Sequence, residues 1–559
     1  MTLPAAPSYV HGACATPLLG RTIGQMLSEA AGRWPDRPAL IAGEARFTWK
    51  ALDARAEALA AGFLALGLNP GDRLGIWSLN RAEWALTQFA AAKAGLILVT
   101  INPAYRLTEL DFALNAVGCA GLVTSERFKT THYLEMLGTL APELASAEPG
   151  ALRAARLPHL RLVVQIGGGA APGLLPFAAL EARAGAAERS RVMELAQTLQ
   201  SDEPVNIQFT SGTTGTPKGV TLSHHNILNN GYFVGRAMRL GPEDRICIPV
   251  PLYHCFGLVM GNLAALTSGA AMVYPGEGFD PLATLRTVAA ERCTALYGVP
   301  TMFLAELDHP EFDRFDLSSL RTGIMAGAPC PVALMRRAIE RMHLTEMTIC
   351  YGMTETSPVS FQSAVDDSLE RRVSTVGRVH PHLEVRIVDA QGRVVPRGET
   401  GELCTRGYSV MLGYWGAPER TAEVVDAAGW MHTGDLAALD PEGFCRIVGR
   451  IKDMVIRGGE NIYPREVEEF LYTHPAVQEV QVFGVPDPRY GEEVCAWIRL
   501  RPGAELTAEA LRAFCRDEIA HQKIPRHVAF VDSFPMTVTG KVQKYLMREA
   551  MIRRLADGA

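Results

Sequence analysis

Apolar residues in the first 200 positions recur in two patterns that alternate along the chain. Residues 22–34 and 48–66 carry them at helical spacing, one turn apart. Short apolar runs that predict buried strands lie at 73–77, 96–101, 121–124 and 160–166. Strands that alternate with helices are typical of βαβ units, so we predict an α/β fold with a largely parallel sheet here.

The pattern changes after residue 376. Short β-type runs broken by Gly, Pro and polar turns indicate an antiparallel β-subdomain over residues 376–449. The rest of the chain predicts a small α+β domain that ends in a basic helix. Its other predicted elements are a helix at 464–473, strands at 477–485 and 493–500, a helix at 507–521 and an edge strand at 527–531.

Composition narrows the class of protein. Of the 559 residues 48% are apolar and 20% charged, so large buried cores are feasible. The net charge of −6 argues against nucleic acid or an anionic membrane as the main partner. The 11 scattered cysteines form no CxxC pair, which indicates reduced thiols in a cytosol-like compartment.

No secretory signal and no membrane-spanning run is evident, because the best candidate run, residues 89–100, contains Lys93. We therefore expect a cytoplasmic protein without an integral membrane segment. The sequence leaves the oligomeric state open, a homodimer included.

Residues 210–219, TSGTTGTPKG, lie between two apolar runs that predict strands. Their glycines allow backbone N–H groups to approach an anion, and Lys218 adds a positive charge. A Walker A loop is excluded because Pro217 precedes the lysine, Gly219 follows it, and the chain returns to a strand. The alternative is a flexible hydroxyl-rich surface loop, but the position between two strands favours phosphate binding.

Residues 160–166 and the following GGGAAPG, 167–173, imitate a strand that enters a dinucleotide-binding turn. Pro172 and Gly173 break the helix that must follow, and the third glycine is misplaced. We predict a surface loop and reject a nicotinamide-dependent dehydrogenase.

Several other segments carry candidate chemistry. His254 lies among aromatic residues in LYHCFG, where most histidines are structural. In YGMTET, Tyr351 offers a face for stacking, Thr354 a hydroxyl for a phosphate, and Glu355 a hard oxygen ligand for Mg²⁺. Asp435 in GWMHTGDL either caps a turn or accepts two hydroxyl hydrogen bonds.

Together these segments resemble the adenylate-forming enzymes, a family of acyl-CoA synthetases, luciferases and peptide-synthetase adenylation domains. TSGTTGTPKG resembles the signature loop, and GIMAGAPC, YGMTET, GWMHTGDL, GRIKD and PMTVTGK follow in family order over nearly the whole chain. SYVHG, HQKIPRHVAF and GKVQKYLMRE look most like the medium-chain fatty acyl-CoA synthetase branch. A peptide-synthetase module is disfavoured because no carrier-protein domain follows Lys541, and nothing indicates the oxygen chemistry of a luciferase.

The resemblance implies a domain organisation. A large N-terminal domain of βαβ-type subdomains plus the β-subdomain would span 1–449, and residues 450–453 with Lys452 would form a hinge. Residues 454–559 would form a mobile α+β lid. In the family this lid carries a lysine, here Lys541, that bridges the substrate carboxylate, the α-phosphate and the ribose ring oxygen. In isolation, Lys541 next to Gly540 would be read as a solvated surface charge.

The resemblance also implies site residues, with ATP, Mg²⁺ and coenzyme A as cofactor and co-substrates. The implied ATP- and AMP-binding residues are Thr210, Ser211, Gly212, Thr213, Thr214, Gly215, Lys218, Gly327, Ala328, Pro329, Tyr351, Gly352, Met353, Thr354, Asp435, Arg450 and Lys541. The implied acyl pocket is formed by His254, Phe256, Val299, Thr301, Ala328 and Met353. Catalytic roles fall to Lys541, Thr354, Glu355 and His254, the metal ligand is Glu355, and Gly458 and Gly459 border the coenzyme A tunnel.

The predicted function is an AMP-forming acyl-CoA synthetase for a medium-chain fatty acid. An aryl- or other carboxylate-CoA ligase is the nearest alternative, because only the pocket would differ. A catalytically silent nucleotide-binding regulator is the alternative of another class, which the retained Lys218, Glu355 and Lys541 disfavour.

Overall fold

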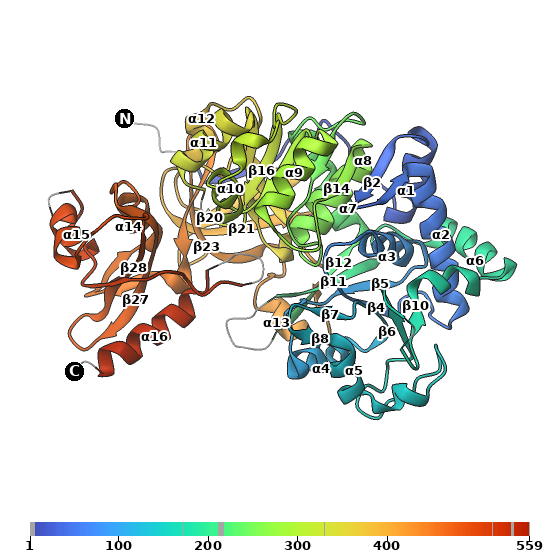
Figure 1. The fold of residues 1–559 in the computed structure, drawn as a ribbon. Coiled ribbons are helices and arrows are strands. Elements are labelled where there is room, and N and C mark those ends of the chain that lie inside the picture. The colour runs from blue at the N-terminus through green and yellow to red at the C-terminus, as the bar shows by residue number, and fades with distance from the viewer. Residues whose placement is uncertain are drawn as a thin grey trace. The chain divides into compact units, whose positions relative to one another are not determined.

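The computed structural model describes residues 6–169, 171–210, 217–328, 330–516, 518–537 and 542–557 (Figure 1). These residues form two compact units. Unit 1 takes its residues from 1–10, 385–405 and 432–559, and unit 2 from 11–384 and 406–431. The predicted boundaries at 449 and 454 stay a prediction.

Unit 2 contains an eight-stranded sheet in which six neighbouring strands are parallel, as the alternating pattern predicts. Two antiparallel strands, β12 and β22, extend one edge. In sheet order the strands are β10 (Leu175–Pro176), β9 (Leu162–Gln165), β6 (Cys119–Thr124), β4 (Arg73–Trp77), β5 (Ile97–Thr100), β11 (Pro204–Thr210), β12 (Lys218–Ser223) and β22 (Gly413–Tyr414).

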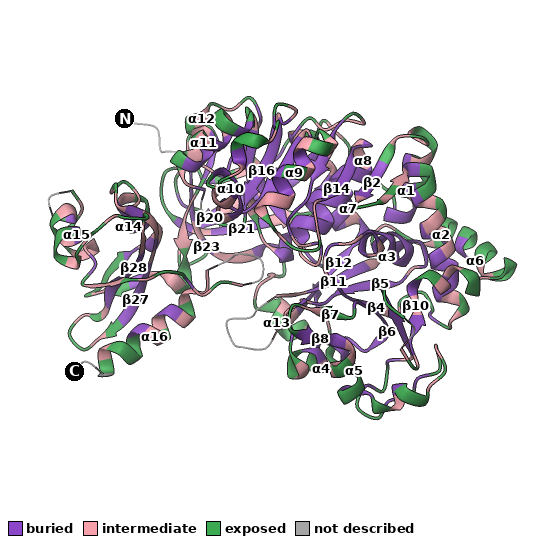
Figure 2. Ribbon diagram, viewed as in Figure 1, coloured by how far each residue is buried: buried purple, intermediate pink, exposed green. Residues whose placement is uncertain are grey.

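A second sheet of unit 2 has nine strands, and its central strands are again parallel. In order they are β19 (Arg378–Val379), β18 (Val359–Gln362), β17 (Glu346–Gly352), β16 (Thr322–Ala326), β15 (Ala295–Gly298), β13 (Arg245–Cys247), β14 (Ala271–Tyr274), β2 (Pro38–Ala42) and β3 (Ala45–Thr48). The central strands of both sheets are buried, and so are most residues of the helices α3 (Ala82–Lys93) and α7 (His224–Ala237) (Figure 2). Ser223 caps α7 by accepting a hydrogen bond from the Asn226 N–H, as expected of a serine that directly precedes a helix.

The remaining described elements of unit 2 surround these sheets. The helices are α1 (Ile23–Arg33), α2 (Trp49–Ala65), α4 (Leu107–Ala116), α5 (Tyr133–Leu140), α6 (Ala186–Thr198), α8 (Ala264–Ser268), α9 (Pro281–Glu291), α10 (Pro300–Leu307), α11 (Val332–Met342), α12 (Leu369–Ser374) and α13 (Pro418–Ala422). A small hairpin is formed by β7 (Arg127–Phe128) and β8 (Thr131–His132).

Unit 1 contains the β-subdomain sheet and a second sheet with three helices. The first sheet has the order β1 (Tyr9–His11), β20 (Leu383–Val388), β21 (Gly401–Gly407), β23 (Met431–Leu439) and β24 (Cys445–Arg450). The second has the order β26 (Glu460–Ile462), β25 (Val455–Arg457), β28 (Gly491–Leu500) and β27 (Val477–Asp487), with β29 (His527–Phe530) also on β28. The helices are α14 (Pro464–Leu471), α15 (Ala508–Cys515) and α16 (Lys544–Asp557).

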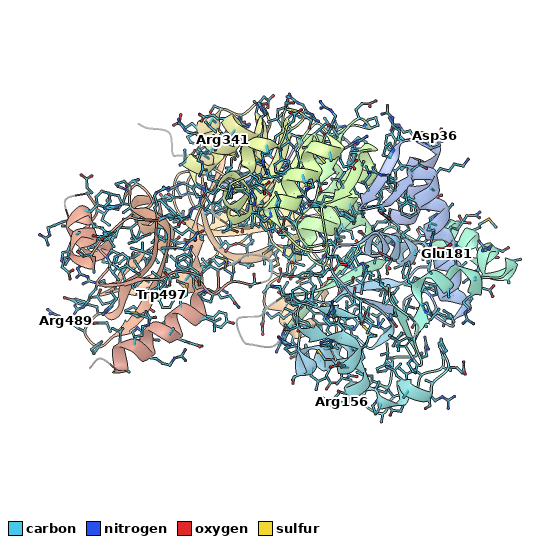
Figure 3. The ribbon with its side chains drawn as sticks, in the orientation of Figure 1. Asp36, Arg156, Glu181, Arg341, Arg489 and Trp497 are labelled. Atoms are coloured by element: carbon cyan, nitrogen blue, oxygen red, sulfur yellow. The ribbon has the colours of Figure 1, made fainter. Side chains whose placement is uncertain are left out.

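Trp497 on β28 anchors a small core of unit 1 (Figure 3). Its ring centroid lies 6.1 Å from that of Phe483, and the Arg554 guanidinium lies 5.1 Å above the indole. The basic C-terminal helix therefore packs one side on this sheet, and the predicted α+β character is confirmed.

Several elements are shorter in the structure than the apolar pattern indicates. The apolar run at 246–251 forms strand β13 only as far as Cys247, because Pro249 and Pro251 lack the N–H that a central strand must donate. The predicted helix at 507–521 is α15, which ends at Cys515. The GGGAAPG segment leads from β9 into the short strand β10, so the predicted loop is confirmed for its described residues. None of the described helices has the length and apolar character needed to cross a bilayer.

Candidate active site

Three neighbouring parallel strands of unit 2 bring predicted site residues to one sheet edge. Gly298 of β15 pairs with Met325 of β16, and Ala326 of β16 pairs with Cys350 of β17. Val299, Gly327 and Tyr351 come next along these three strands, at their carboxyl ends, where open α/β sheets bind ligands. A Cβ at Gly327 would lie only 3.2 Å from Cγ1 of Val299, so the small residue permits this close approach.

The turn after β17 is formed by residues of YGMTET. A Cβ at Gly352 would lie 1.7 Å from the Pro358 carbonyl oxygen, so no larger residue fits. Met353 donates its N–H to the same oxygen over 3.0 Å. The turn buries Thr354 and Glu355 and leaves Tyr351 half-buried at its start.

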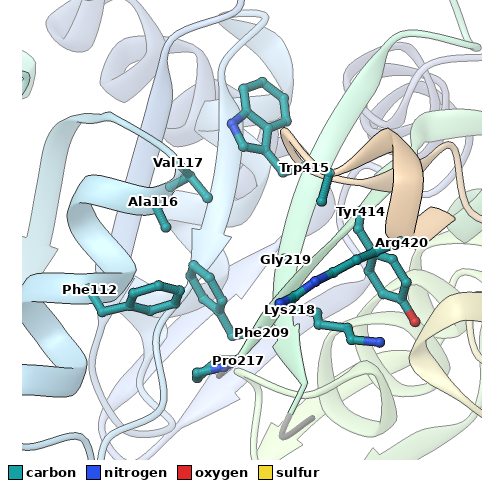
Figure 4. A pocket seen from close by; sticks show the side chains of 11 residues that line it. Phe112, Ala116, Val117, Phe209, Pro217, Lys218, Gly219, Tyr414, Trp415 and Arg420 are labelled. Carbon is teal, nitrogen blue, oxygen red and sulfur yellow. The ribbon is translucent and has the colours of Figure 1, made fainter. Parts of the chain in front are cut away.

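Glu355 lies in a buried contact that the sequence analysis missed. Tyr414 donates its hydroxyl to Oε1 of Glu355 over 2.9 Å, and Lys218 Nζ lies 4.7 Å from the Tyr414 ring centroid. Figure 4 shows the Lys218 side chain beside the Tyr414 ring. The pairing of β12 with β22 places Tyr414 beside Lys218, and no local motif around Tyr414 predicts its contact with Glu355.

The surroundings of Glu355 fit the predicted metal ligand. Burial and the nearby Glu355 carboxylate raise the pKa of Tyr414, which therefore stays a neutral donor. Among the residues that the structure describes, no Lys, Arg or His forms an ion pair with Glu355. A buried carboxylate without a counter-charge is costly, and a hard cation such as Mg²⁺ would remove that cost.

A cavity of about 230 Å³ is lined in part by Lys218 (Figure 4). Aromatic and small residues of β11, α4 and the β22–α13 region form most of its wall, and Lys218 and Arg420 contribute cations. The lining residues are Phe112, Ala116, Val117, Phe209, Pro217, Lys218, Gly219, Tyr414, Trp415, Ala417 and Arg420. None of the predicted acyl-pocket residues lines this cavity.

His254 precedes a π-helix, η4 (Phe256–Leu263), which the sequence analysis did not predict. Its Nδ1 accepts the Phe256 N–H over 3.2 Å. One ring nitrogen therefore has a structural role, as most histidines among aromatic residues do. Phe256 stacks on Tyr297 with ring centroids 5.6 Å apart. Phe256 and Val299 belong to one buried cluster, whereas Thr301 and Met353 are half-buried and Ala328 is exposed.

Side chains from neighbouring elements bond to carbonyls of this π-helix. Gln88 of α3 donates to the Leu258 carbonyl over 3.2 Å, and the Tyr297 hydroxyl donates to the Met260 carbonyl over 3.0 Å. A π-helix breaks the usual i to i−4 pattern and is frequent at functional sites. These bonds fix the backbone that carries Phe256, the predicted pocket residue.

The signature segment is described only at its ends. Thr210 ends β11 and pairs with Lys218, which begins β12, so the predicted strands on either side of the segment are confirmed. The predicted site residues Ser211, Gly212, Thr213, Thr214 and Gly215 lie outside the described residues, as do Pro329 and Lys541.

Asp435 and Arg450 form the corresponding polar centre of unit 1. They face each other across β23 and β24, and Arg450 Nε lies 2.9 Å from Oδ1 of buried Asp435. Burial and the nearby Arg450 lower the pKa of Lys452, the predicted hinge residue. Asp435 and Arg450 are therefore in direct contact, and both lie close enough to Lys452 for their charges to act on it.

Gly458 and Gly459 form the turn between β25 and β26 with φ of 58° and 87°. The Gly458 N–H donates to the Tyr490 carbonyl over 2.8 Å. Positive φ explains why glycines occupy both positions. Their role at a coenzyme A tunnel stays a prediction.

Comparison with known families decides the class. The family model described as AMP-binding enzyme matches residues 27–415, and that described as AMP-binding enzyme C-terminal domain matches residues 466–541. The chain belongs to the AMP-binding enzymes. The predicted hinge of this AMP-binding enzyme, residues 450–453, lies between the two matched segments.

Relatives of this AMP-binding enzyme match it over nearly their whole length. The putative acyl-CoA synthetase YngI of Bacillus subtilis (strain 168) is 48% identical and covers 96% of this chain and 98% of its own. The medium-chain acyl-CoA ligase ACSF2, mitochondrial, of Danio rerio is 48% identical, with coverages of 98% and 91%. The crystal structure of the anthranilate CoA ligase AuaEII in complex with anthranoyl-AMP matches with a TM-score of 0.85 at 26% identity, covering 97% and 99%.

Proposed function

We propose that this AMP-binding enzyme is an ATP-dependent acyl-CoA synthetase that activates a medium-chain fatty acid. The acyl-CoA ligase activity rests on membership of the family and on near full-length relatives named for it. The medium-chain acid rests on the relative named medium-chain acyl-CoA ligase. The structural observation that carries the proposal is the buried Glu355 carboxylate, which forms no ion pair with any Lys, Arg or His that the structure describes.

The first half-reaction joins two anions. A carboxylate oxygen of the acid attacks the α-phosphorus of ATP, the bond to the β-phosphate oxygen breaks, and pyrophosphate leaves. Positive charge from Lys218 and Lys541 lowers the repulsion and aligns the two groups. Glu355 would hold Mg²⁺, which supplies further charge neutralisation on the phosphates when bound.

The second half-reaction forms the thioester. The thiol of coenzyme A loses its proton and attacks the acyl carbon of the adenylate, and AMP leaves. In this proposal the lid turns about Lys452 between the two steps, which withdraws Lys541 and brings Gly458 and Gly459 to the pantetheine. The cation needed for adenylation is then absent from the thioester-forming site.

Separate assays of the two half-reactions test the proposal. Lys541→Ala should reduce adenylate formation by about a hundredfold or more, because one charge on the transition state is lost. Thioester formation from supplied acyl-adenylate should stay within a few-fold of the parent. Lys523→Ala is the control, since Lys523 lies in the same unit and pairs with Glu466. An equal loss of rate in both half-reactions of Lys541→Ala would contradict the proposal that Lys541 acts only in adenylate formation.

An aryl-CoA ligase is the second candidate, because the matched AuaEII structure is titled an anthranilate CoA ligase. Phe256 and Tyr297 would offer an aromatic acid a stacking surface. A preference for aryl acids over fatty acids would favour this candidate. The cytoplasmic location and the homodimer stay predictions, and the Danio rerio relative carries the word mitochondrial in its name.

A further inference from the structure

A cluster of three metal-ligating side chains lies in the β-subdomain sheet of unit 1. Glu402 and Cys404 are two residues apart on β21 and therefore share one face of the strand. His432 lies on the neighbouring strand β23. One ligand atom from each residue lies within 4.8 Å of the other two.

The distances inside this cluster match a metal site. His432 Nδ1 lies 3.5 Å from Cys404 Sγ and 2.9 Å from Oε2 of Glu402. Zinc bonds of about 2.3 Å to sulfur and about 2.0 Å to nitrogen at a tetrahedral angle place S and N roughly 3.5 Å apart. The S–N pair is therefore at ligand spacing without rearrangement, and a Glu402 oxygen lies within 4.8 Å of both ligand atoms.

The donor set selects the class of ion. One thiolate, one imidazole and one carboxylate favour a borderline-soft divalent cation such as Zn²⁺ over Mg²⁺ or Ca²⁺. Cys404 is fully buried and His432 is half-buried, so the sulfur faces inward and the ring lies toward the surface. We propose that Glu402, Cys404 and His432 form a binding site for Zn²⁺ that is distinct from the magnesium site proposed at Glu355.

The same cluster is connected to the turn that carries Asp435. Oε1 of Glu402 accepts the Gly434 N–H over 3.1 Å, and the Thr433 hydroxyl donates to the Leu403 carbonyl over 2.7 Å. A cation bound to Glu402 and His432 would hold the strands on both sides of this turn and fix the position of the turn. We infer that bound Zn²⁺ keeps Asp435 from adjusting to ATP and so inhibits ATP binding, a consequence that rests on the proposed function.

Cobalt binding tests the site without turnover. The probe is Co²⁺ added to tag-free protein carrying Cys14→Ser, because exposed Cys14 lies 3.7 Å from His11 Nδ1 and offers a competing surface thiol. We expect one Co²⁺ per chain, a thiolate-to-cobalt absorption band, its displacement by Zn²⁺, and release of the thiol proton. Absence of the band overturns the proposal.

Variants in the same background identify the ligands. Cys404→Ala should abolish the band, and His432→Gln should weaken Co²⁺ binding at least about tenfold. Cys445→Ala is the matched control, since Cys445 is a fully buried thiol on β24 of the same sheet. Because His432 is half-buried, its variant tests the site even if Cys404→Ala unfolds. A band or affinity unchanged in both variants overturns the assignment.

Inhibition tests the consequence for Asp435. Zn²⁺ should inhibit AMP formation by the parent, and Cys404→Ala should need at least about tenfold more Zn²⁺ while its metal-free activity stays within about twofold. Binding of Zn²⁺ without inhibition overturns the inference that the site acts on ATP binding through Asp435. Absence of turnover in both proteins contradicts the proposed function instead, and the cobalt experiment still decides the site.

Discussion

Two buried carboxylates, Glu355 in unit 2 and Asp435 in unit 1, differ in the charge of the groups that contact them. Glu355 is 7% exposed and accepts a hydrogen bond from the neutral Tyr414 hydroxyl. Asp435 is 4% exposed and is paired with the Arg450 guanidinium. Glu355 forms no ion pair with the cationic residues that the structure describes, which suits an incoming metal ion, whereas a carboxylate already paired suits neutral hydroxyl donors. The difference supports the metal role predicted for Glu355 and the ribose role predicted for Asp435.

The largest effect is expected at Glu355. Glu355→Gln keeps the size of the side chain and removes its charge, so kcat/KM should fall by about 10² to 10³. Pyrophosphate release measured against Mg²⁺ concentration should show a higher Mg²⁺ requirement. Tyr414→Phe should have a smaller effect, because the carboxylate loses a hydrogen bond and keeps its charge. An unchanged Mg²⁺ requirement in Glu355→Gln would remove it as the metal ligand.

The next effect concerns Asp435. Asp435→Ala loses two hydroxyl acceptors and leaves Arg450 without its carboxylate, so the Kd for ATP should rise about tenfold to a hundredfold. Calorimetric titration of ATP measures the change, and kcat at saturating ATP should fall much less. Glu399→Gln, an exposed carboxylate of unit 1, is the control. An unchanged ATP affinity in Asp435→Ala contradicts the ribose role.

The smallest effect is on stability and concerns groups of unit 2 that are buried in neutral form. Burial lowers the pKa of His224 and of His380 to about 3. Below the ordinary value near 6.5, the unfolded chain takes up protons that the folded chain does not, so stability falls as the pH falls. Each histidine should lower the free energy of unfolding by about 1.4 kcal/mol for each pH unit that the pH falls between about pH 6 and pH 4.

Urea unfolding at several pH values measures this dependence. His224→Asn keeps an acceptor for the Ile23 N–H and does not titrate, so the slope should fall by about 1.4 kcal/mol per pH unit. His343→Asn is the control, because His343 is exposed and Asn tolerates its φ of 60°. An identical slope in parent and His224→Asn would show that His224 is not buried neutral.

Local chemistry explains how much the sequence could predict. Ser223 capping α7 and the alternation of helices and strands depend on nearby residues, so they were accessible. The bond from Tyr414 to Glu355 joins two segments that are far apart in the sequence. The π-helix after His254 accepts a hydrogen bond from Gln88 of another helix. Neither feature is visible in the hydrophobic periodicity or the composition of its own segment.

The most direct test of the proposed function is coenzyme A-dependent AMP formation with acids from acetate to palmitate, together with benzoate and cinnamate. The account predicts stoichiometric AMP and acyl-CoA, with the highest kcat/KM for a saturated acid of medium length such as octanoate. A maximum at benzoate or cinnamate would contradict the fatty-acid assignment. Absence of AMP with every acid would contradict the synthetase itself.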